Sequence, residues 1–197
     1  MRVIAGSLRS RRFEAPPGLK TRPTSDRLRE TLFNVVAARI EGAEFLDLYA
    51  GSGAVGMEAL SRGAARVVFV ERAASALKVL RGNLEGLGLK DGVEVRAESV
   101  GAFLSRGSPG TGFDIVFLDP PYDAEGEYET ALGLLGVQGI GMLAPDALVI
   151  AEHRRKDVLK DRYGALVRSR LLMQGDAALS FYQAASQQVS ESANQPG

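Results

Sequence analysis

Short buried-strand patterns alternate with stretches of helical periodicity along most of the chain. Five segments have the length and apolar content of core strands, at 45–48, 66–70, 93–95, 113–118 and 147–151. Between them, apolar residues recur every three or four positions, as on the buried face of a helix. This alternation is typical of a parallel sheet that is covered by helices on both faces. The pattern therefore predicts a three-layer α/β fold.

The two ends of the chain depart from this alternation. Residues 3–5 and 12–14 flank a turn of Gly, Ser and Arg residues, which predicts a short N-terminal β-hairpin. Residues 163–172 and 177–182, separated by a Gln-Gly-Asp turn, predict a long terminal hairpin. Together with the five core strands, this hairpin predicts a Rossmann-like, mostly parallel sheet of seven strands with one antiparallel strand.

A chain of 197 residues that is 45% hydrophobic is long enough for one domain with a sizeable core. We expect a single domain over 1–185, in which 1–20 form a basic hairpin extension. The tail, 186–197, is rich in Ser, Gln, Glu and Asn and has little to bury, so we expect it to be disordered.

A helix is predicted over 28–40, where apolar residues share one face. Arg22, Arg27 and Arg29 crowd its beginning, where the helix dipole disfavours cations. This placement suggests an anionic ligand, and ordinary solvation of the side chains is an equal alternative.

The net charge is zero, but its distribution along the chain is uneven. Residues 1–40 carry nine basic against three acidic side chains, 41–152 carry eight against seventeen, and 153–170 carry seven against two. Basic terminal segments around an acidic centre suit a polyanionic partner. Solvated helix faces are the simpler explanation of each charge run.

Composition excludes several kinds of site. The chain has no cysteine, so thiolate nucleophiles, disulfides and cysteine metal sites are excluded. Its single histidine, His153, cannot build a histidine-rich metal site, and we expect no metal. No apolar segment approaches the length of a membrane span, which predicts a soluble, cytoplasmic protein.

A glycine-rich turn follows the strand at 45–48. The sequence Gly51-Ser-Gly53-Ala-Val-Gly56 has the Gly-x-Gly-x-x-Gly spacing between a strand and a helix that is typical of nucleotide binding. Glu71 ends the next strand, 20 positions after Gly51, and could hold ribose hydroxyls. Asp47 would repel a pyrophosphate but could receive an ammonium group, although it could instead be a simple strand-end cap. S-adenosylmethionine carries an ammonium and a sulfonium, and fits this pattern better than a dinucleotide does.

The segment 113–122 joins a buried strand to a constrained polar turn. Pro120 and Pro121 prevent further ladder pairing, so the backbone leaves the sheet with carbonyls available. The Asp119 carboxylate and the Pro120 carbonyl could accept the two hydrogens of an NH2 group, while Tyr122 stacks on the attached ring. The alternative is a surface turn with an Asp cap.

Both motifs resemble those of known methyltransferases. Asp119-Pro-Pro-Tyr122 resembles the Asp/Asn-Pro-Pro-Tyr motif of S-adenosylmethionine-dependent enzymes that methylate amino nitrogens. The glycine-rich turn with its preceding acid resembles the first motif of the class I methyltransferases, and implies that Asp47, Ala50, Gly51 and Gly53 contact the cofactor. The same resemblance implies that Glu71 binds the ribose, that Arg72 lies near the adenine, and that Glu98 accepts from its N6 amino group. The family more often has Asp at the position of Glu98.

The order of motifs over residues 1–184 resembles the bacterial 16S rRNA guanine-N2 methyltransferases of the RsmD type. The resemblance rests on 1–6, 21–34, 47–53, 117–122 and 175–182. It implies that Thr24 lies beside the methionine end of the cofactor, and that the partner is 16S rRNA or a small-subunit assembly intermediate. We expect a monomer. The RNA-binding residues that it implies are Arg9, Arg11, Arg12, Arg22 and Arg27.

Other functions fit parts of the pattern. The same fold could methylate adenine N6, cytosine N4 or a protein glutamine, because Asp at position 119 leaves the acceptor open. A non-catalytic RNA-binding assembly factor would not require the intact cofactor and Asp-Pro-Pro-Tyr motifs. A dehydrogenase is disfavoured by Asp47, and titration with S-adenosylmethionine against NAD would separate it from the methyltransferases.

Overall fold

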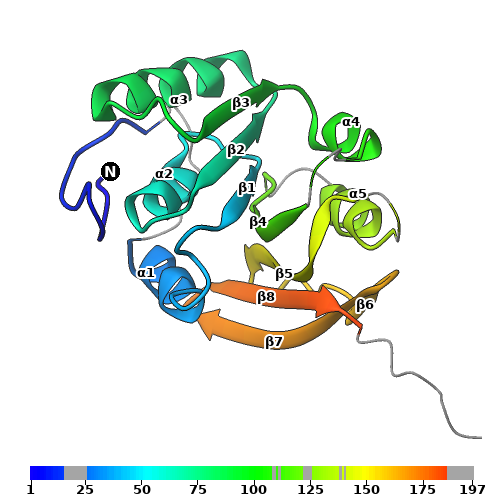
Figure 1. Ribbon diagram of the computed structural model, residues 1–197. Coiled ribbons are helices and arrows are strands. Elements are labelled where there is room, and N and C mark those ends of the chain that lie inside the picture. Colours follow the sequence, from blue (N-terminus) through cyan, green and yellow to red (C-terminus); the bar gives the residue numbers. More distant parts are fainter. Residues whose placement is uncertain are drawn as a thin grey trace, which may run out of the picture.

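A single sheet forms the centre of the computed structural model, which describes residues 1–15, 26–107, 110, 112–121, 126–137, 139 and 141–185. Across these residues the sheet has eight strands in the order β3-β2-β1-β4-β5-β8-β7-β6 (Figure 1). The strands are β1 (Glu44–Leu48), β2 (Arg66–Glu71), β3 (Val93–Ala97), β4 (Phe113–Leu118), β5 (Leu143–Arg154), β6 (Arg162–Tyr163), β7 (Leu166–Gln174) and β8 (Ala177–Ala184). The helices are α1 (Asp26–Val35), α2 (Ala54–Ser61), α3 (Ala74–Leu87), α4 (Val100–Ser105) and α5 (Glu127–Leu135).

The first five strands are parallel, which confirms the predicted α/β architecture. β1 pairs with β2 and β4, β2 pairs with β3, and β4 pairs with β5, all in parallel. β8 lies antiparallel between β5 and β7. Because the parallel strands all end at one edge of the sheet, the turns that follow β1, β2, β3 and β4 are brought together there.

The sheet has eight strands among the described residues, one more than the seven predicted. The single strand expected over 163–172 is interrupted at Gly164 and Ala165, so that β6 folds back antiparallel onto β7. Gly164 has φ +56°, and a Cβ there would lie 2.5 Å from the carbonyl oxygen of Gly136. The turn therefore packs on the end of α5, a contact that strand periodicity does not reveal.

The first helix is shorter than its apolar pattern predicts. α1 ends at Val35, although Val36 and Ile40 remain buried in the turn that follows. Consecutive β-branched residues lower helix propensity, and the turn keeps their side chains in the core without continuing the helix.

Two apolar layers enclose the sheet, one on each face. One layer joins Phe45, Phe69 and Phe117 to residues of α1, α2 and α3. The other joins neighbouring strand residues, such as Leu46 and Val116, to α4 and α5 (Figure 1). Successive strand residues thus face opposite layers, as in a sheet that is buried on both faces. No helix in the described part of the chain is long and apolar enough to cross a membrane.

The N-terminal hairpin is present as one antiparallel bridge between Arg2 and Arg12. It is fixed to α2 through Glu58, whose carboxylate accepts hydrogen bonds from the backbone N–H groups of Ile4 (2.7 Å) and Ala5 (2.9 Å). Arg29 lies fully buried beside the same carboxylate, with 3.8 Å between its Nε and Glu58 Oε2. Its position at the start of α1 is therefore explained by an internal carboxylate and gives no support to an anionic ligand.

Candidate active site

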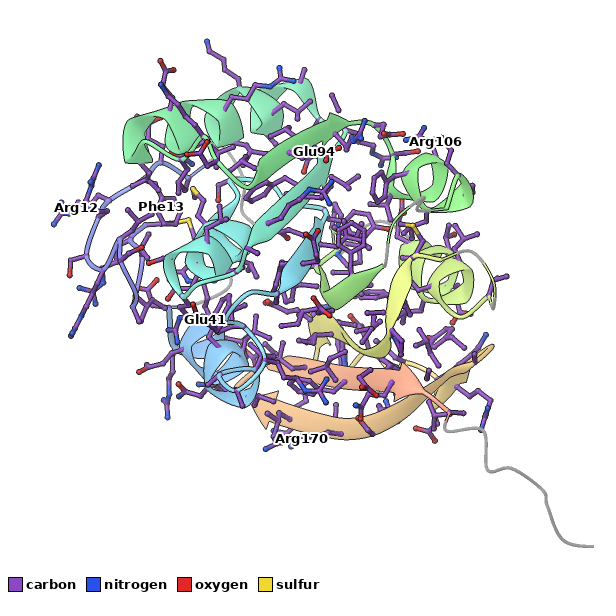
Figure 2. The ribbon with its side chains drawn as sticks, in the orientation of Figure 1. Arg12, Phe13, Glu41, Glu94, Arg106 and Arg170 are labelled. Carbon is purple, nitrogen blue, oxygen red and sulfur yellow. The ribbon has the colours of Figure 1, made fainter. Side chains whose placement is uncertain are left out.

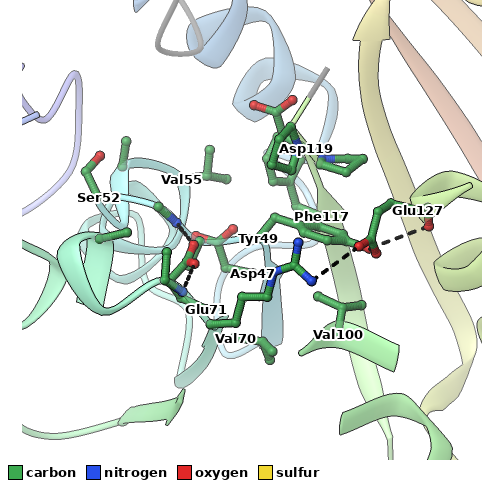
Figure 3. Close-up of a pocket in the computed structure, with 18 of the residues that line it drawn as sticks. Asp47, Tyr49, Ser52, Val55, Val70, Glu71, Val100, Phe117, Asp119 and Glu127 are labelled. Atoms are coloured by element: carbon green, nitrogen blue, oxygen red, sulfur yellow. Dashed lines mark hydrogen bonds and ion pairs between the residues drawn. The ribbon is translucent and has the colours of Figure 1, made fainter. Parts of the chain in front are cut away.

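A cavity of about 380 Å³ opens where β1, β2, β3 and β4 end (Figure 3). Most of the predicted cofactor and acceptor residues line it: Asp47, Ala50, Gly51, Glu71, Arg72, Glu98, Asp119 and Pro120. Two of the predicted cofactor and acceptor residues, Thr24 and Tyr122, lie outside the described residues. The sheet topology thus brings segments that are up to 73 positions apart to one place, from Asp47 to Pro120.

The glycine-rich turn is shaped by the core beneath it. Gly51 and Gly53 have φ of 55° and 81°, conformations that favour glycine. A Cβ on Gly53 would lie 2.4 Å from Leu80 Cδ1, and one on Gly56 would lie 2.3 Å from Phe69 Cε1. Gly53 and Gly56 therefore let the turn and α2 sit close to the sheet. Gly51 itself lines the cavity.

Asp47 is buried and links β1 to α2. Its Oδ2 accepts a hydrogen bond of 2.9 Å from the backbone N–H of Gly56. Burial raises the pKa of Asp47 to about 8; the Gly56 N–H opposes this increase, and the nearby Glu71 adds to it. The alternative of a structural cap is thus partly realised, although the same side chain also lines the cavity.

Glu71 connects the end of β2 to the glycine-rich turn. Its Oε2 accepts from the N–H of Gly51 at 2.9 Å, and its Oε1 accepts from the N–H of Ala73 at 2.7 Å (Figure 3). Each carboxylate oxygen can accept a further hydrogen bond. The side chain is therefore held in place by the backbone and still has capacity for a ligand hydroxyl.

Tyr49 and Glu127 form part of the wall that sequence reasoning missed. The Tyr49 hydroxyl donates to Glu127 Oε2 at 2.7 Å. Arg72 Nη1 lies 3.8 Å from Glu127 Oε1 (Figure 3). Burial, and then the hydrogen bond to Glu127, raise the pKa of Tyr49, so its hydroxyl stays protonated. Tyr49 has a positive φ of 61°, a rare conformation for a bulky residue that follows a strand. Neither feature has a local signature in the sequence.

Glu98 follows the end of β3, lines the cavity and forms an ion pair with Arg106. Arg106, which follows α4, donates to Glu98 Oε1, and this hydrogen bond raises the pKa of Arg106. The neighbouring Ser99 begins α4 by accepting from the N–H of Ala102 at 3.3 Å. One Glu98 oxygen is thus occupied, which leaves the other for a ligand amino group.

Asp119 follows β4 at the mouth of the cavity and is half-buried, while Pro120 is buried beside it. Burial, then Glu152, then Asp47 raise the pKa of Asp119 well above its ordinary value. Glu152 was not singled out from the sequence. It lies within the long apolar strand β5, and only the pairing of β5 with β4 places it beside Asp119.

The lining of the cavity is strongly acidic. Asp47, Glu71, Glu98, Asp119 and Glu127 all contribute carboxylates, and Arg72 is the one basic side chain among the described lining residues. Such a wall disfavours pyrophosphate, and a cationic ligand is attracted to it because the cation favours ionisation of Asp47 and Asp119, whose pKa values are raised in the free protein. The described residues contain no group of three or more side chains that could hold a metal ion.

The four predicted RNA-binding arginines that the structure describes do not line the cavity. Arg9, Arg11 and Arg12 are exposed on the hairpin, from whose outer side Arg12 projects (Figure 2). Arg11 also donates to the carbonyl oxygen of Gly86 on α3 at 3.1 Å. Arg27 is exposed on α1, and Arg22 lies outside the described ranges. The hairpin nevertheless reaches the site, because Met1 and Ala15 line the cavity.

Comparison with known proteins gives consistent matches over nearly the whole chain. Residues 1–183 match a family model described as conserved hypothetical protein 95. Ribosomal RNA small subunit methyltransferase D of Escherichia coli is 35% identical, covering 97% of this chain and 93% of its own. YlbH of Bacillus subtilis, named as a proposed rRNA methyltransferase, is 38% identical over 92% and 98% of the two chains. A solved structure of yhhF, a proposed methyltransferase of E. coli, has a TM-score of 0.83 at 35% identity and covers 95% and 99%.

Proposed function

The chain belongs to the family of the ribosomal RNA small subunit methyltransferases D, and from this premise we propose that it methylates the N2 amino group of a guanine in 16S rRNA with S-adenosylmethionine. The observation that carries the proposal is the acidic cavity that ends at the Asp119-Pro120-Pro121 rim. The carboxylates of the cavity wall favour a cationic cofactor. The hydrogen-bond acceptors of the rim favour an amino group as the methyl acceptor.

The cofactor fits the residues that are present. Asp47 and the other carboxylates favour the ammonium and the sulfonium, and Glu71 offers acceptors for ribose hydroxyls. Glu98 has one oxygen available for the adenine amino group, and Arg72 stands nearby at the wall. S-adenosylmethionine, when bound, supplies a methyl group on a sulfur that is already a good leaving group.

The rim orients the acceptor. Asp119 and the Pro120 carbonyl accept the two amino hydrogens, which directs the nitrogen lone pair towards the cavity. Tyr122 is proposed to stack on the guanine base. To reach this site, the base must first flip out of the RNA helix. Because positioning supplies most of the catalysis, the reaction requires little acid-base machinery. The methylated nitrogen loses its extra proton afterwards.

The acceptor can be tested directly. Purified protein is incubated with methyl-labelled S-adenosylmethionine and with either naked rRNA or assembled small subunits, and labelled nucleosides are mapped by mass spectrometry. The proposal predicts N2-methylguanosine at one site. Labelled N6-methyladenosine, N4-methylcytidine or methylglutamine would identify another acceptor, and cofactor binding without transfer to any of these would support an assembly factor.

Replacing Asp119 tests the role of the rim. Asp119→Ala should bind S-adenosylmethionine nearly as well as the parent, but lose about 2 to 4 kcal/mol of transition-state stabilisation because a charged acceptor is removed. This corresponds to a rate decrease of roughly 30-fold to 1000-fold in single-turnover assays at saturating cofactor and RNA. Asp119→Asn should lose less, because its amide oxygen still accepts one hydrogen bond.

A matched control is Asp91→Ala, which removes an exposed carboxylate that does not line the cavity. It should turn over at the parent rate. A parent-like rate in Asp119→Ala would refute the proposed role of the rim, whichever base is methylated.

A further inference from the structure

Asp119 and Glu152 are neighbours across the pair of strands β4 and β5. In the parallel register, Leu118 lies beside Ala151, so the next residues on each strand are Asp119 and Glu152. Side chains alternate along a strand, and Phe117 and Ile150 both face the core layer of α1, α2 and α3. Asp119 and Glu152 follow them by two positions, and therefore point to this same face.

Glu152 is buried, and neighbouring elements hold its backbone in place. Its exposed fraction is 2%, and the preceding residues Val149, Ile150 and Ala151 are fully buried. Its backbone carbonyl accepts a hydrogen bond of 2.7 Å from the Tyr128 hydroxyl on α5. On its other side, the register places it opposite the buried Leu179 of β8. The carboxylate thus remains beside Asp119 with little freedom to move into solvent.

A second carboxylate also acts on Asp119. Asp47 faces Asp119 from β1 and acts on it in the same direction as Glu152 does. Across the cavity, Arg72 is already paired with Glu127. His153 lies on the opposite face of β5, where its ring is within 2.9 Å of Ser180 Oγ. Asp47 therefore adds to the effect of Glu152, and a negative charge on Glu152 makes ionisation of Asp119 less favourable.

We propose that Glu152 is a positioning residue for methyl transfer, whose negative charge opposes ionisation of Asp119 and thereby sets the pH at which Asp119 accepts the amine. The proposal rests on the proposed function, because it assigns Asp119 the amino acceptor role. An ionised Asp119 can accept from the amino group with both oxygens, whereas a protonated one presents a competing donor. Two close carboxylates titrate as a pair, so the proton affinity of Asp119 depends on the charge of Glu152.

The variant Glu152→Gln tests this coupling, because it removes the charge and keeps the size of the side chain. Single-turnover rates are measured against pH with saturating S-adenosylmethionine and the RNA that mass mapping identifies. The parent rate should fall as the pH is lowered through the titration of the pair. In Glu152→Gln this fall should move to lower pH by about one unit or more, because Asp119 then ionises without a neighbouring negative charge.

Three variants separate this effect from a purely structural one. Glu152→Asp keeps the charge, and should keep the parent pH dependence even if the rate falls. Glu129→Gln removes a carboxylate that is bound to Lys160 on the surface, and should change neither rate nor pH dependence. Asp119→Asn should lose the pH-dependent step, because the pair no longer exists. An unchanged pH dependence in Glu152→Gln, or a persistent step in Asp119→Asn, would overturn the proposal.

Carboxyl ¹³C chemical shifts test the coupling of the two carboxyls without turnover. In the free parent protein, the two side chains should titrate in two well-separated steps, and Glu152→Gln should lower the titration of Asp119. Independent titration of the two carboxyls would refute the coupling. A protein that shows the coupling but methylates no RNA would instead refute the proposed function, so the two failures are distinguishable.

Discussion

Carboxylates that are wholly or partly buried occur at two places in the fold, and the groups around them differ greatly. At the hairpin anchor, Glu58 accepts two backbone hydrogen bonds and is also bonded to Arg62 at 2.7 Å. At the cavity, Asp47 and Asp119 are surrounded by further carboxylates, and burial raises the pKa of each. The comparison shows that a satisfied buried charge holds the fold together, whereas crowded like charges beside a cavity indicate a cationic ligand.

The anchor satisfies the carboxylate of Glu58, whereas Nε and Nη1 of the buried Arg29 make no hydrogen bond among the described residues. Glu58 is fully buried, and Arg29 and Arg62 flank it. Arg29 also donates to the carbonyl oxygen of Arg2 at 2.6 Å and to Asp26 at 3.0 Å. These bonds join α1, α2 and the hairpin. Because Met1 and Ala15 line the cavity, the anchor also supports one wall of the site.

The largest effect on stability is expected from Glu58→Ala. It leaves the buried Arg29 without its neighbouring carboxylate and removes the acceptor of two backbone N–H groups. Breaking a buried ion pair in this way should lower the free energy of unfolding by about 3 to 5 kcal/mol, measured by urea denaturation. Glu85→Ala, an exposed change on α3, is the control and should alter stability little. A decrease below about 1 kcal/mol in Glu58→Ala would contradict the role of the anchor.

Asp47→Asn should have the opposite effect on the free protein. The folded-state pKa of Asp47, about 8, is above its ordinary value of 3.8, so its contribution to stability is present at low pH and disappears as pH rises to 8. Asn can still accept from the Gly56 N–H and avoids this penalty. The variant should therefore nearly match the parent near pH 4 and become more stable than it as the pH rises, by roughly 5 kcal/mol at pH 8.

The same substitution should weaken binding of S-adenosylmethionine, because a negative charge is removed from the wall of the cavity. Calorimetric titration at pH 8 measures this affinity beside the urea denaturation. If the stability of Asp47→Asn and of the parent depended on pH in the same way, the pKa of Asp47 would not be raised in the free protein.

The parts of this comparison that the sequence predicts are those encoded locally. The glycine-rich turn, Glu71 and the proline rim each follow directly from a strand pattern, so their arrangement at one edge could be predicted. Glu152 could not be, because its role depends on the register of β5 against β4. Arg29 was misinterpreted for a similar reason: its partner Glu58 lies 29 positions away, on another helix. Thr24 and Tyr122 remain predictions.

The smallest effect is expected at the exposed side of the hairpin. Replacing Arg9, Arg11 and Arg12 together by Ala should weaken RNA binding. The slope of log affinity against log salt should fall by about one for each of these arginines that binds a phosphate in the parent complex. Fluorescence anisotropy at several salt concentrations measures both quantities. Affinity for S-adenosylmethionine should stay at the parent value, because these side chains do not line the cavity.

A second triple variant removes as much charge elsewhere, at positions that are also exposed: Arg155, Lys156 and Arg170. Arg170 projects from β7, well away from the hairpin (Figure 2). If the hairpin binds RNA, this control should keep more affinity and a steeper salt slope than the hairpin variant. Equal decreases in the two variants would mean that RNA responds only to overall charge. The hairpin would then serve only the structural role that its bonds to Glu58 already give it.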